Sequence, residues 1–191
     1  MSVRIAQLYT ALALLANSIA GVAAAETPDI ASLREGDMKK LTVHARPLDV
    51  SDVPFQSEDG TELTLADYEG KLVLLNFWAT WCAPCREEMP ALAQLQDEYG
   101  GDDFEVVTVA TGRNQPQAMV RFFEEIGVEN LPLHTDARQQ LAREMGVLGL
   151  PVTVILGPDG LEIARLQGGA DWSSDSSRAI IEALLAVGRV H

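Results

Sequence analysis

The sequence has few cysteines and few basic residues, and each shortage excludes a class of protein. Only two of the 191 residues are cysteine, which excludes the framework of several disulfides found in many small secreted domains. Lysine and arginine together number 14 against 28 aspartates and glutamates, so the net charge is −14. This balance argues against binding to nucleic acid or to an anionic membrane surface, because the protein could not neutralise the phosphates or lipids.

The N-terminus has the pattern of a secretory signal peptide. Arg4 supplies a basic start, residues 5–25 are mostly apolar, and three alanines before Glu26 form a small-residue cleavage site. The alternative is an uncleaved membrane anchor, because residues 5–25 are long enough to span a bilayer. Several polar residues interrupt the segment, so we expect cleavage after Ala25. Both interpretations place the rest of the chain outside the cytoplasm, in a bacterial periplasm.

Hydrophobic patterns divide the chain into a signal segment (1–25), an N-terminal extension (26–50) and one domain (51–191). The apolar run at 72–78 predicts a strand buried on both faces. The other predicted strands are 41–45, 104–110, 131–134, 151–156 and 161–166, with a β-hairpin at 55–63 and helices at 30–34, 85–99, 117–126, 137–145 and 177–187. This alternation predicts an α/β fold, in which helices cover both faces of a mixed β-sheet.

Both cysteines lie in the stretch WCAPC, between the strand at 72–78 and the helix that follows it. A helix N-terminus favours negative charge, which lowers a cysteine pKa and makes Cys82 a candidate nucleophilic thiolate. Cys85, one turn later, is expected to be more buried and able to resolve a mixed disulfide. Pro84 suits the first helical turn, where its missing N–H costs nothing. The residues alone leave three uses open: a redox pair, half of a metal site, or a small structural staple.

Glu88 follows Cys85 by three residues and therefore shares its helical face. The rest of that face is apolar, so the carboxylate is expected to be partly desolvated. Desolvation should raise the Glu88 pKa and let this group exchange a proton with Cys85. The alternative is a solvated Glu88 at the edge of the helix. Asn76, on the strand beneath the site, needs a hydrogen-bond partner.

Pro151 stands at the start of the predicted strand 151–156, a position where proline is acceptable without any special role. Cis bonds make up only about 5–6% of X–Pro bonds, so the residues alone do not decide the Leu150–Pro151 isomer. Trp81 could offer a flat apolar contact to a partner, whereas Trp78 is expected in the core. The histidines His44, His134 and His191 are scattered, although His134 could approach the cysteines in space.

The stretches FWATWCAPC (77–85) and GLPVT (149–153) resemble the thioredoxin superfamily. More narrowly, the chain resembles the TlpA-like thiol–disulfide reductases of bacterial envelopes, from about residue 50 to its end. The resemblance implies a thioredoxin-like fold with an N-terminal β-hairpin extension. It also implies a central insertion of one helix and one strand between residues 117 and 134.

The same resemblance implies a role for each matching residue. Cys82 would be the nucleophile and Cys85 the resolving cysteine. Pro151 would be a cis-proline that places the Leu150 backbone to hold a client's extended chain, with Trp81 and Pro84 also in contact with the client. Glu88 would be the glutamate beside the buried cysteine. Asn76 departs from cytoplasmic thioredoxins, which have a buried aspartate there, and Glu88 could take over its proton transfer.

From this resemblance we expect an oxidoreductase that reduces disulfides of periplasmic client proteins, in cytochrome c maturation or cytochrome oxidase copper-site assembly. A membrane thiol carrier is the expected electron donor. We expect a monomer with no metal and no cofactor beyond the Cys82–Cys85 pair. Ala83 and Pro84 supply no imidazole between the cysteines, which disfavours a disulfide oxidase. That oxidase and a copper-delivery protein with a metal-binding CxxC are the alternatives.

Overall fold

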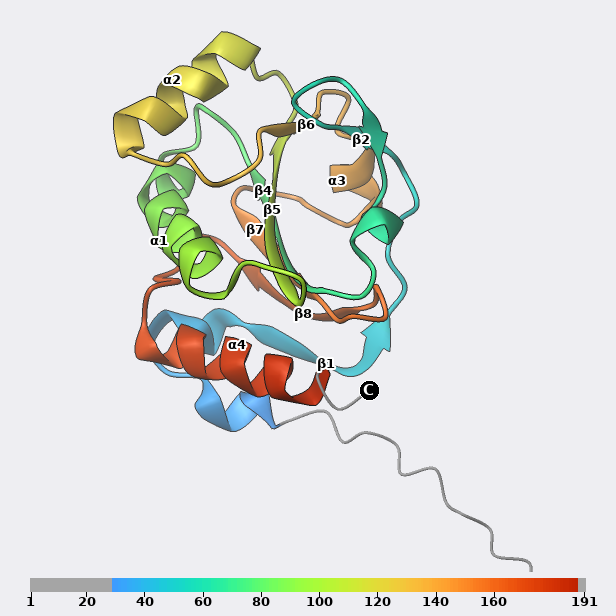
Figure 1. Ribbon diagram of the computed structural model, residues 1–191, viewed down its shortest axis with the longest axis vertical. Coiled ribbons are helices and arrows are strands. Elements are labelled where there is room, and N and C mark those ends of the chain that lie inside the picture. Colours follow the sequence, from blue (N-terminus) through green and yellow to red (C-terminus); the bar gives the residue numbers. More distant parts are fainter. Residues whose placement is uncertain (1–28, 189–191) are drawn as a thin grey trace, which may run out of the picture.

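Residues 29–188, which the computed structural model describes, contain an eight-stranded sheet in the order β1-β8-β7-β4-β5-β6-β2-β3 (Figure 1). The strands are β1 (Thr42–Leu48), β2 (Phe55–Gln56), β3 (Glu62–Leu63), β4 (Leu72–Trp78), β5 (Phe104–Thr111), β6 (His134–Asp136), β7 (Val152–Leu156) and β8 (Glu162–Gln167). Strands β4, β5 and β6 are parallel, and every other pairing is antiparallel. The mixed α/β sheet predicted from the sequence is confirmed.

Helices cover both faces of this sheet. The helices are α1 (Ala83–Tyr99), α2 (Pro116–Ile126), α3 (Gln140–Glu144) and α4 (Asp175–Gly188), with the 3-10 helices η1 (Ile30–Leu33), η2 (Gly36–Lys40) and η3 (Leu65–Tyr68). All seven residues of β4 are buried, and the six apolar ones alternate between two hydrophobic clusters. One cluster joins β4 to α1, α2 and α4, and the other joins it to α3 and η3.

Most of the predicted elements form, and two are displaced. The hairpin predicted at 55–63 is present as β2 and β3, and Gly60 takes a positive φ of 85° in its turn. The strand predicted at 131–134 is wrong in position, because β6 begins only at His134. The helix predicted at 137–145 is too long, because α3 covers only Gln140–Glu144.

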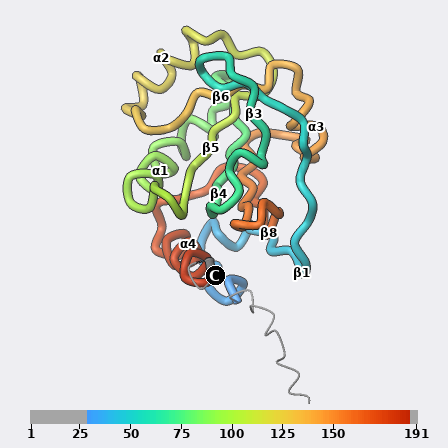
Figure 2. Tube along the Cα trace, turned by 45° about the vertical axis from the view of Figure 1, so that its right-hand side comes forward, coloured from blue at the N-terminus to red at the C-terminus, as the bar shows by residue number. Residues whose placement is uncertain are grey.

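The chain before the hairpin packs along the C-terminal part of the fold. Helices η1 and η2 lie beside α4, as the two views in Figures 1 and 2 show. Strand β1 pairs with β8 and so forms one edge of the sheet, whereas β3 forms the other. The predicted signal peptide or anchor at 1–25 lies outside the described residues. Within residues 29–188, no helix is long and apolar enough to cross a membrane.

The register of the central strands fixes where the cysteines lie. Phe77, near the end of β4, pairs with Val152, the first residue of β7. Pro151 therefore lies beside the carboxyl end of β4, where the chain turns toward α1. In open α/β sheets this carboxyl edge is where ligand-binding and catalytic groups gather.

Candidate functional site

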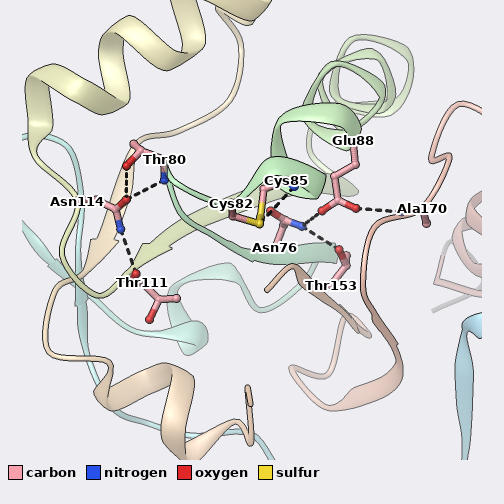
Figure 3. The surroundings of a disulfide bond; sticks show 9 residues. All are labelled: Asn76, Thr80, Cys82, Cys85, Glu88, Thr111, Asn114, Thr153 and Ala170. Atoms are coloured by element: carbon pink, nitrogen blue, oxygen red, sulfur yellow. Dashed lines mark hydrogen bonds between the residues drawn. A yellow bond between two sulfur atoms is a disulfide. The ribbon is translucent and has the colours of Figure 1, made fainter. Parts of the chain in front are cut away.

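Cys82 and Cys85 form a disulfide at the N-terminus of α1 (Figure 3). Cys82 is the N-cap residue, and its sulfur accepts a hydrogen bond of 3.3 Å from the backbone N–H of Cys85. Pro84 lies in the first turn, as the sequence predicted. The Cys82 side chain is 5% exposed and that of Cys85 is fully buried. After reduction, the helix N-terminus would therefore stabilise a thiolate on Cys82, the more accessible of the two sulfurs.

The peptide bond between Leu150 and Pro151 is cis. Pro151 is buried, and Leu150 is partly exposed while packing against both hydrophobic clusters. One of these clusters includes Cys82 and Cys85, so the segment before β7 packs at the cysteine end of the sheet. The backbone N–H of Gly168 in turn donates to the Pro151 carbonyl, at 2.9 Å.

The two tryptophans differ in exposure as the sequence predicted. Trp78 is fully buried, and its ring stacks on that of Phe123 with 5.2 Å between centroids. Trp81, directly before Cys82, is 68% exposed. It therefore presents a large apolar surface next to the cysteine that we expect to react.

Hydrogen bonds with Asn114 fix the turn before Cys82, and nothing in the sequence pattern indicated them. The side-chain oxygen of Asn114 accepts hydrogen bonds from the backbone N–H and the hydroxyl of Thr80, at 2.9 and 3.0 Å. The Asn114 amide group also donates to the Thr111 carbonyl (Figure 3). The loop after β5 thereby holds the loop that leads into α1.

Glu88 is buried one turn after Cys85 in α1, with only 2% of its surface exposed. One carboxylate oxygen accepts a hydrogen bond from the Asn76 amide at 2.9 Å, and the other accepts from the backbone N–H of Ala170 at 3.2 Å (Figure 3). Burial raises the pKa of Glu88 to about 7, although both of these hydrogen bonds favour the charged form. The solvated alternative for Glu88 is therefore wrong.

Asn76 has the partners that the sequence argument required. Its amide group donates to Glu88 and also to the hydroxyl of Thr153, both at 2.9 Å. Its side-chain oxygen is buried and accepts no hydrogen bond from the part of the chain that the structure describes. An amide can donate through nitrogen to a carboxylate or, when turned, accept through oxygen from a carboxylic acid. Asn76 can therefore accompany Glu88 in both of its protonation states.

An open cavity of about 570 Å³ adjoins Glu88 and Pro84. Its lining comes from three separate segments of the chain: η2, the first half of α1, and the loop between β8 and α4. Besides Glu88, the charged residues in its wall are Asp37, Glu87 and Asp171. Of these residues, only Glu88 was placed at the site by its sequence spacing from Cys85; Glu87 is exposed to solvent at the cavity wall.

The two histidines that the structure describes have partners away from the cysteines. His134 hydrogen-bonds to the Tyr68 hydroxyl at 3.0 Å, and His44 pairs with Glu162 at 2.6 Å. His191 lies outside the described residues. Within residues 29–188, no three His, Cys, Asp or Glu side chains are placed to hold a metal ion.

Comparisons with known proteins agree with this geometry. A family model described as the AhpC/TSA family matches residues 48–162. The thioredoxin-like protein YneN of Bacillus subtilis is 39% identical over 111 residues, which cover 58% of this chain and 64% of YneN. The thiol–disulfide oxidoreductase ResA of the same organism is 36% identical over 121 residues, covering 62% of this chain and 66% of ResA. The match thus spans just under two thirds of either relative.

A solved structure from Chlorobium tepidum has a similar fold. It is provisionally named as the thiol:disulfide interchange protein DsbE, and it superposes with a TM-score of 0.65 at 26% sequence identity. The superposition covers 75% of this chain and 99% of that one.

Proposed function

Because the chain belongs to the AhpC/TSA family of thioredoxin-like proteins, we propose that it is a thiol–disulfide oxidoreductase that reduces client proteins. The observation that carries the proposal is the Cys82–Cys85 pair at a helix N-terminus with a buried glutamate one turn further along the same helix. The names of ResA and of the Chlorobium tepidum protein support the same class of reaction.

The first step uses the position of Cys82. In the reduced protein its thiolate attacks one sulfur of a client disulfide. A mixed disulfide forms between Cys82 and the client, the client's own S–S bond breaks, and its second sulfur leaves as a thiolate that takes a proton from solvent. Trp81 directly precedes Cys82, and Leu150 packs against the hydrophobic cluster that contains both cysteines, so Trp81 and the Leu150–Pro151 segment would contact the client chain.

The second step uses Glu88. Its carboxylate accepts the proton of the buried Cys85 thiol, and the Cys85 thiolate attacks the sulfur of Cys82. The Cys82–Cys85 disulfide forms, the client's first sulfur leaves as a thiolate, and the proton on Glu88 passes out to it or to solvent. Two electrons move from the cysteine pair to the client. The pKa of about 7 suits Glu88 to both accepting and releasing a proton near neutral pH.

The client and the compartment follow from the sequence resemblance and belong to the same proposal. The N-terminal pattern supports export to the periplasm, as a free protein after cleavage or as one held at the inner membrane. There the clients would be oxidised proteins of cytochrome c or cytochrome oxidase copper-site biogenesis. A membrane thiol carrier would return the pair to the reduced state. We also propose that the protein is a monomer and uses no metal and no cofactor beyond the cysteine pair.

The reduction potential of the Cys82–Cys85 pair tests this function directly. We expect equilibration against glutathione to give a value near thioredoxin's, about −270 mV, rather than near the about −120 mV of the oxidant DsbA. No imidazole lies between the cysteines to stabilise the thiolate further, and the Glu88 carboxylate is buried one helical turn after them.

Two cysteine variants complete the test. Cys82→Ser should abolish client reduction, because the attacking thiolate is lost. Cys85→Ser should accumulate a mixed disulfide with the client, visible on a non-reducing gel. A potential near that of DsbA would make the protein an oxidant, and full activity in Cys82→Ser would end the proposal.

A further inference from the structure

Helix η2 of the N-terminal segment binds the loop between β8 and α4. The Lys40 ammonium group donates a hydrogen bond of 2.6 Å to the Gly169 carbonyl and pairs with Asp37 at 2.9 Å. The second oxygen of Asp37 accepts from the backbone N–H of Asp171, at 3.1 Å. Two side chains of η2 therefore hold the backbone of this loop on either side of Ala170.

The held loop is the one that reaches Glu88. The backbone N–H of Ala170 donates to the Glu88 carboxylate at 3.2 Å. At Gly169 the loop also approaches α1 closely, because a Cβ atom there would lie 3.3 Å from the Pro84 Cβ. Lys40, Gly169, Ala170 and Glu88 thus form a continuous path from the N-terminal segment to the buried carboxylate.

We propose that Lys40 is a positioning residue for Glu88. It anchors the Gly169 carbonyl so that the next N–H stays on the Glu88 carboxylate, and it places a positive charge on that side of the cavity. Lys40 thereby sets the pH at which Glu88 can take the proton of Cys85. This role rests on the proposed function, in which Glu88 is the proton acceptor.

The charges around Glu88 make Lys40 the group to test. Among the described residues, the cavity wall carries three other carboxylates, Asp37, Glu87 and Asp171, and no lysine or arginine. From the sheet, Glu88 is contacted by Asn76, and Asn76 in turn contacts Thr153; both of these residues are uncharged. On the α4 side, Arg178 contacts the Ser173 carbonyl while its guanidinium is paired with Glu98 at 2.8 Å.

Lys40 is the cation that favours the charged form of Glu88, and so lowers its pKa. The hydrogen bond from Lys40 also lowers the pKa of Asp37, so their pair persists over the range in which Glu88 titrates. The Lys40 side chain is 44% exposed and that of Asp37 is 47% exposed, so the pair itself contributes little to folding stability.

The experiment measures the Glu88 pKa in the oxidised full-length protein, from the carboxyl-carbon NMR resonance that disappears in Glu88→Gln. Lys40→Met keeps the length of the side chain but removes its charge and its N–H groups. We expect the Glu88 pKa to rise by about half a unit or more in this variant. Lys40→Arg should restore the wild-type value, because it keeps the charge and the donors.

Lys39→Met is the matched control, since Lys39 is an exposed neighbour on the same short helix. It should leave the Glu88 pKa unchanged, and both methionine variants should unfold at the wild-type temperature. An unchanged Glu88 pKa in Lys40→Met, or an equal shift in Lys39→Met, overturns the proposal.

A rate measurement separates this inference from the proposed function. In the reduced protein, the midpoint of the pH profile for client reduction should rise in Lys40→Met, but not when Glu88→Gln is also present. A protein that reduces no client would refute the proposed function, while the NMR titration would still decide the Lys40 contact. Client reduction with the same pH midpoint in both single-lysine variants would refute the inference alone.

Discussion

Burial of Glu88 links one carboxyl group to the free energy of unfolding of the protein. Its pKa is raised from 4.5 to about 7 in the folded protein, so at intermediate pH the folded protein holds a proton that the unfolded chain releases. The stability contributed by this proton is fully present below the unfolded pKa and is lost as the pH rises through the folded one. A shift of this size corresponds to about 3 kcal/mol.

Replacing Glu88 with glutamine should therefore change the pH dependence of stability. Between about pH 4.5 and pH 8 we expect the wild type to lose up to about 3 kcal/mol relative to Glu88→Gln. Urea denaturation of the oxidised proteins at several pH values measures the difference. Glu87→Gln, on the exposed neighbour, should parallel the wild type. Parallel curves for the wild type and Glu88→Gln would contradict the prediction, because they would mean that Glu88 has the same pKa in the folded and unfolded protein.

Among the elements, strand β8 contains an irregularity that brings two charged residues together. Ile155 and Leu156 of β7 pair with Ala164 and Glu162, which leaves Ile163 as an extra residue in β8. In a regular strand, residues three apart point to opposite faces. The extra residue shifts this alternation, as in a β-bulge, so that the side chains of Glu162 and Arg165 can contact each other.

The side chain of Glu162 links strand β8 to strand β1. It is 2% exposed, and its carboxylate accepts hydrogen bonds from Arg165 at 2.5 and 2.6 Å and contacts His44 of β1 at 2.6 Å. We expect Glu162→Gln to lower the free energy of unfolding by about 2–3 kcal/mol at pH 7, because Arg165 loses its counter-charge in a mostly buried place.

A more exposed ion pair provides the comparison for Glu162. Lys71 and Glu105 pair at 2.7 Å with side chains that are 33% and 28% exposed. Glu105→Gln should cost less than about 1 kcal/mol in the same urea experiment. Equal losses in the two variants would mean that burial of Glu162 adds nothing to the connection between β1 and β8.

The elements that were predicted well are those with a strong local pattern. The mostly apolar run at 72–78 has the bounds of β4, and the spacing of Cys85 and Glu88 placed both on the buried face of α1. The two displaced elements follow from particular residues. Pro132 has no N–H for a sheet ladder, so β6 begins after it. The Asp136 side chain accepts the N–H groups of Gln140 and Ala142, which fixes the start of α3.

The rest of the site depends on contacts between distant parts of the chain. Ala170 reaches Glu88 through its backbone N–H, which no side-chain pattern reveals. Lys40 lies 129 residues from the carbonyl that it binds, and Asn114 lies 34 residues from Thr80. Such partners are set by the packing of complete elements, so spacing within one helix or strand cannot indicate them.

For the whole molecule, the redox state of the cysteine pair is linked to folding stability. In the oxidised protein, the buried Cys82–Cys85 disulfide is uncharged. Reduction replaces it with thiol groups that can ionise, and these compete with the Glu88 carboxylate for protons. The short disulfide loop itself constrains the unfolded chain little. A folded domain that favours its own disulfide is a reductant, in contrast to DsbA, whose reduced form is stabilised.

We therefore expect the oxidised protein to be more stable than the reduced protein. The difference should equal about 1.4 kcal/mol for each 30 mV by which the folded pair is more reducing than the same pair in the unfolded chain. Urea denaturation with and without a reductant gives the stability difference, and redox titration in native buffer and in high urea gives the two potentials. The double variant Cys82→Ser/Cys85→Ser should show no effect of the reductant. A reduced protein that is the more stable form would identify the pair as an oxidant, because the fold would then favour accepting electrons.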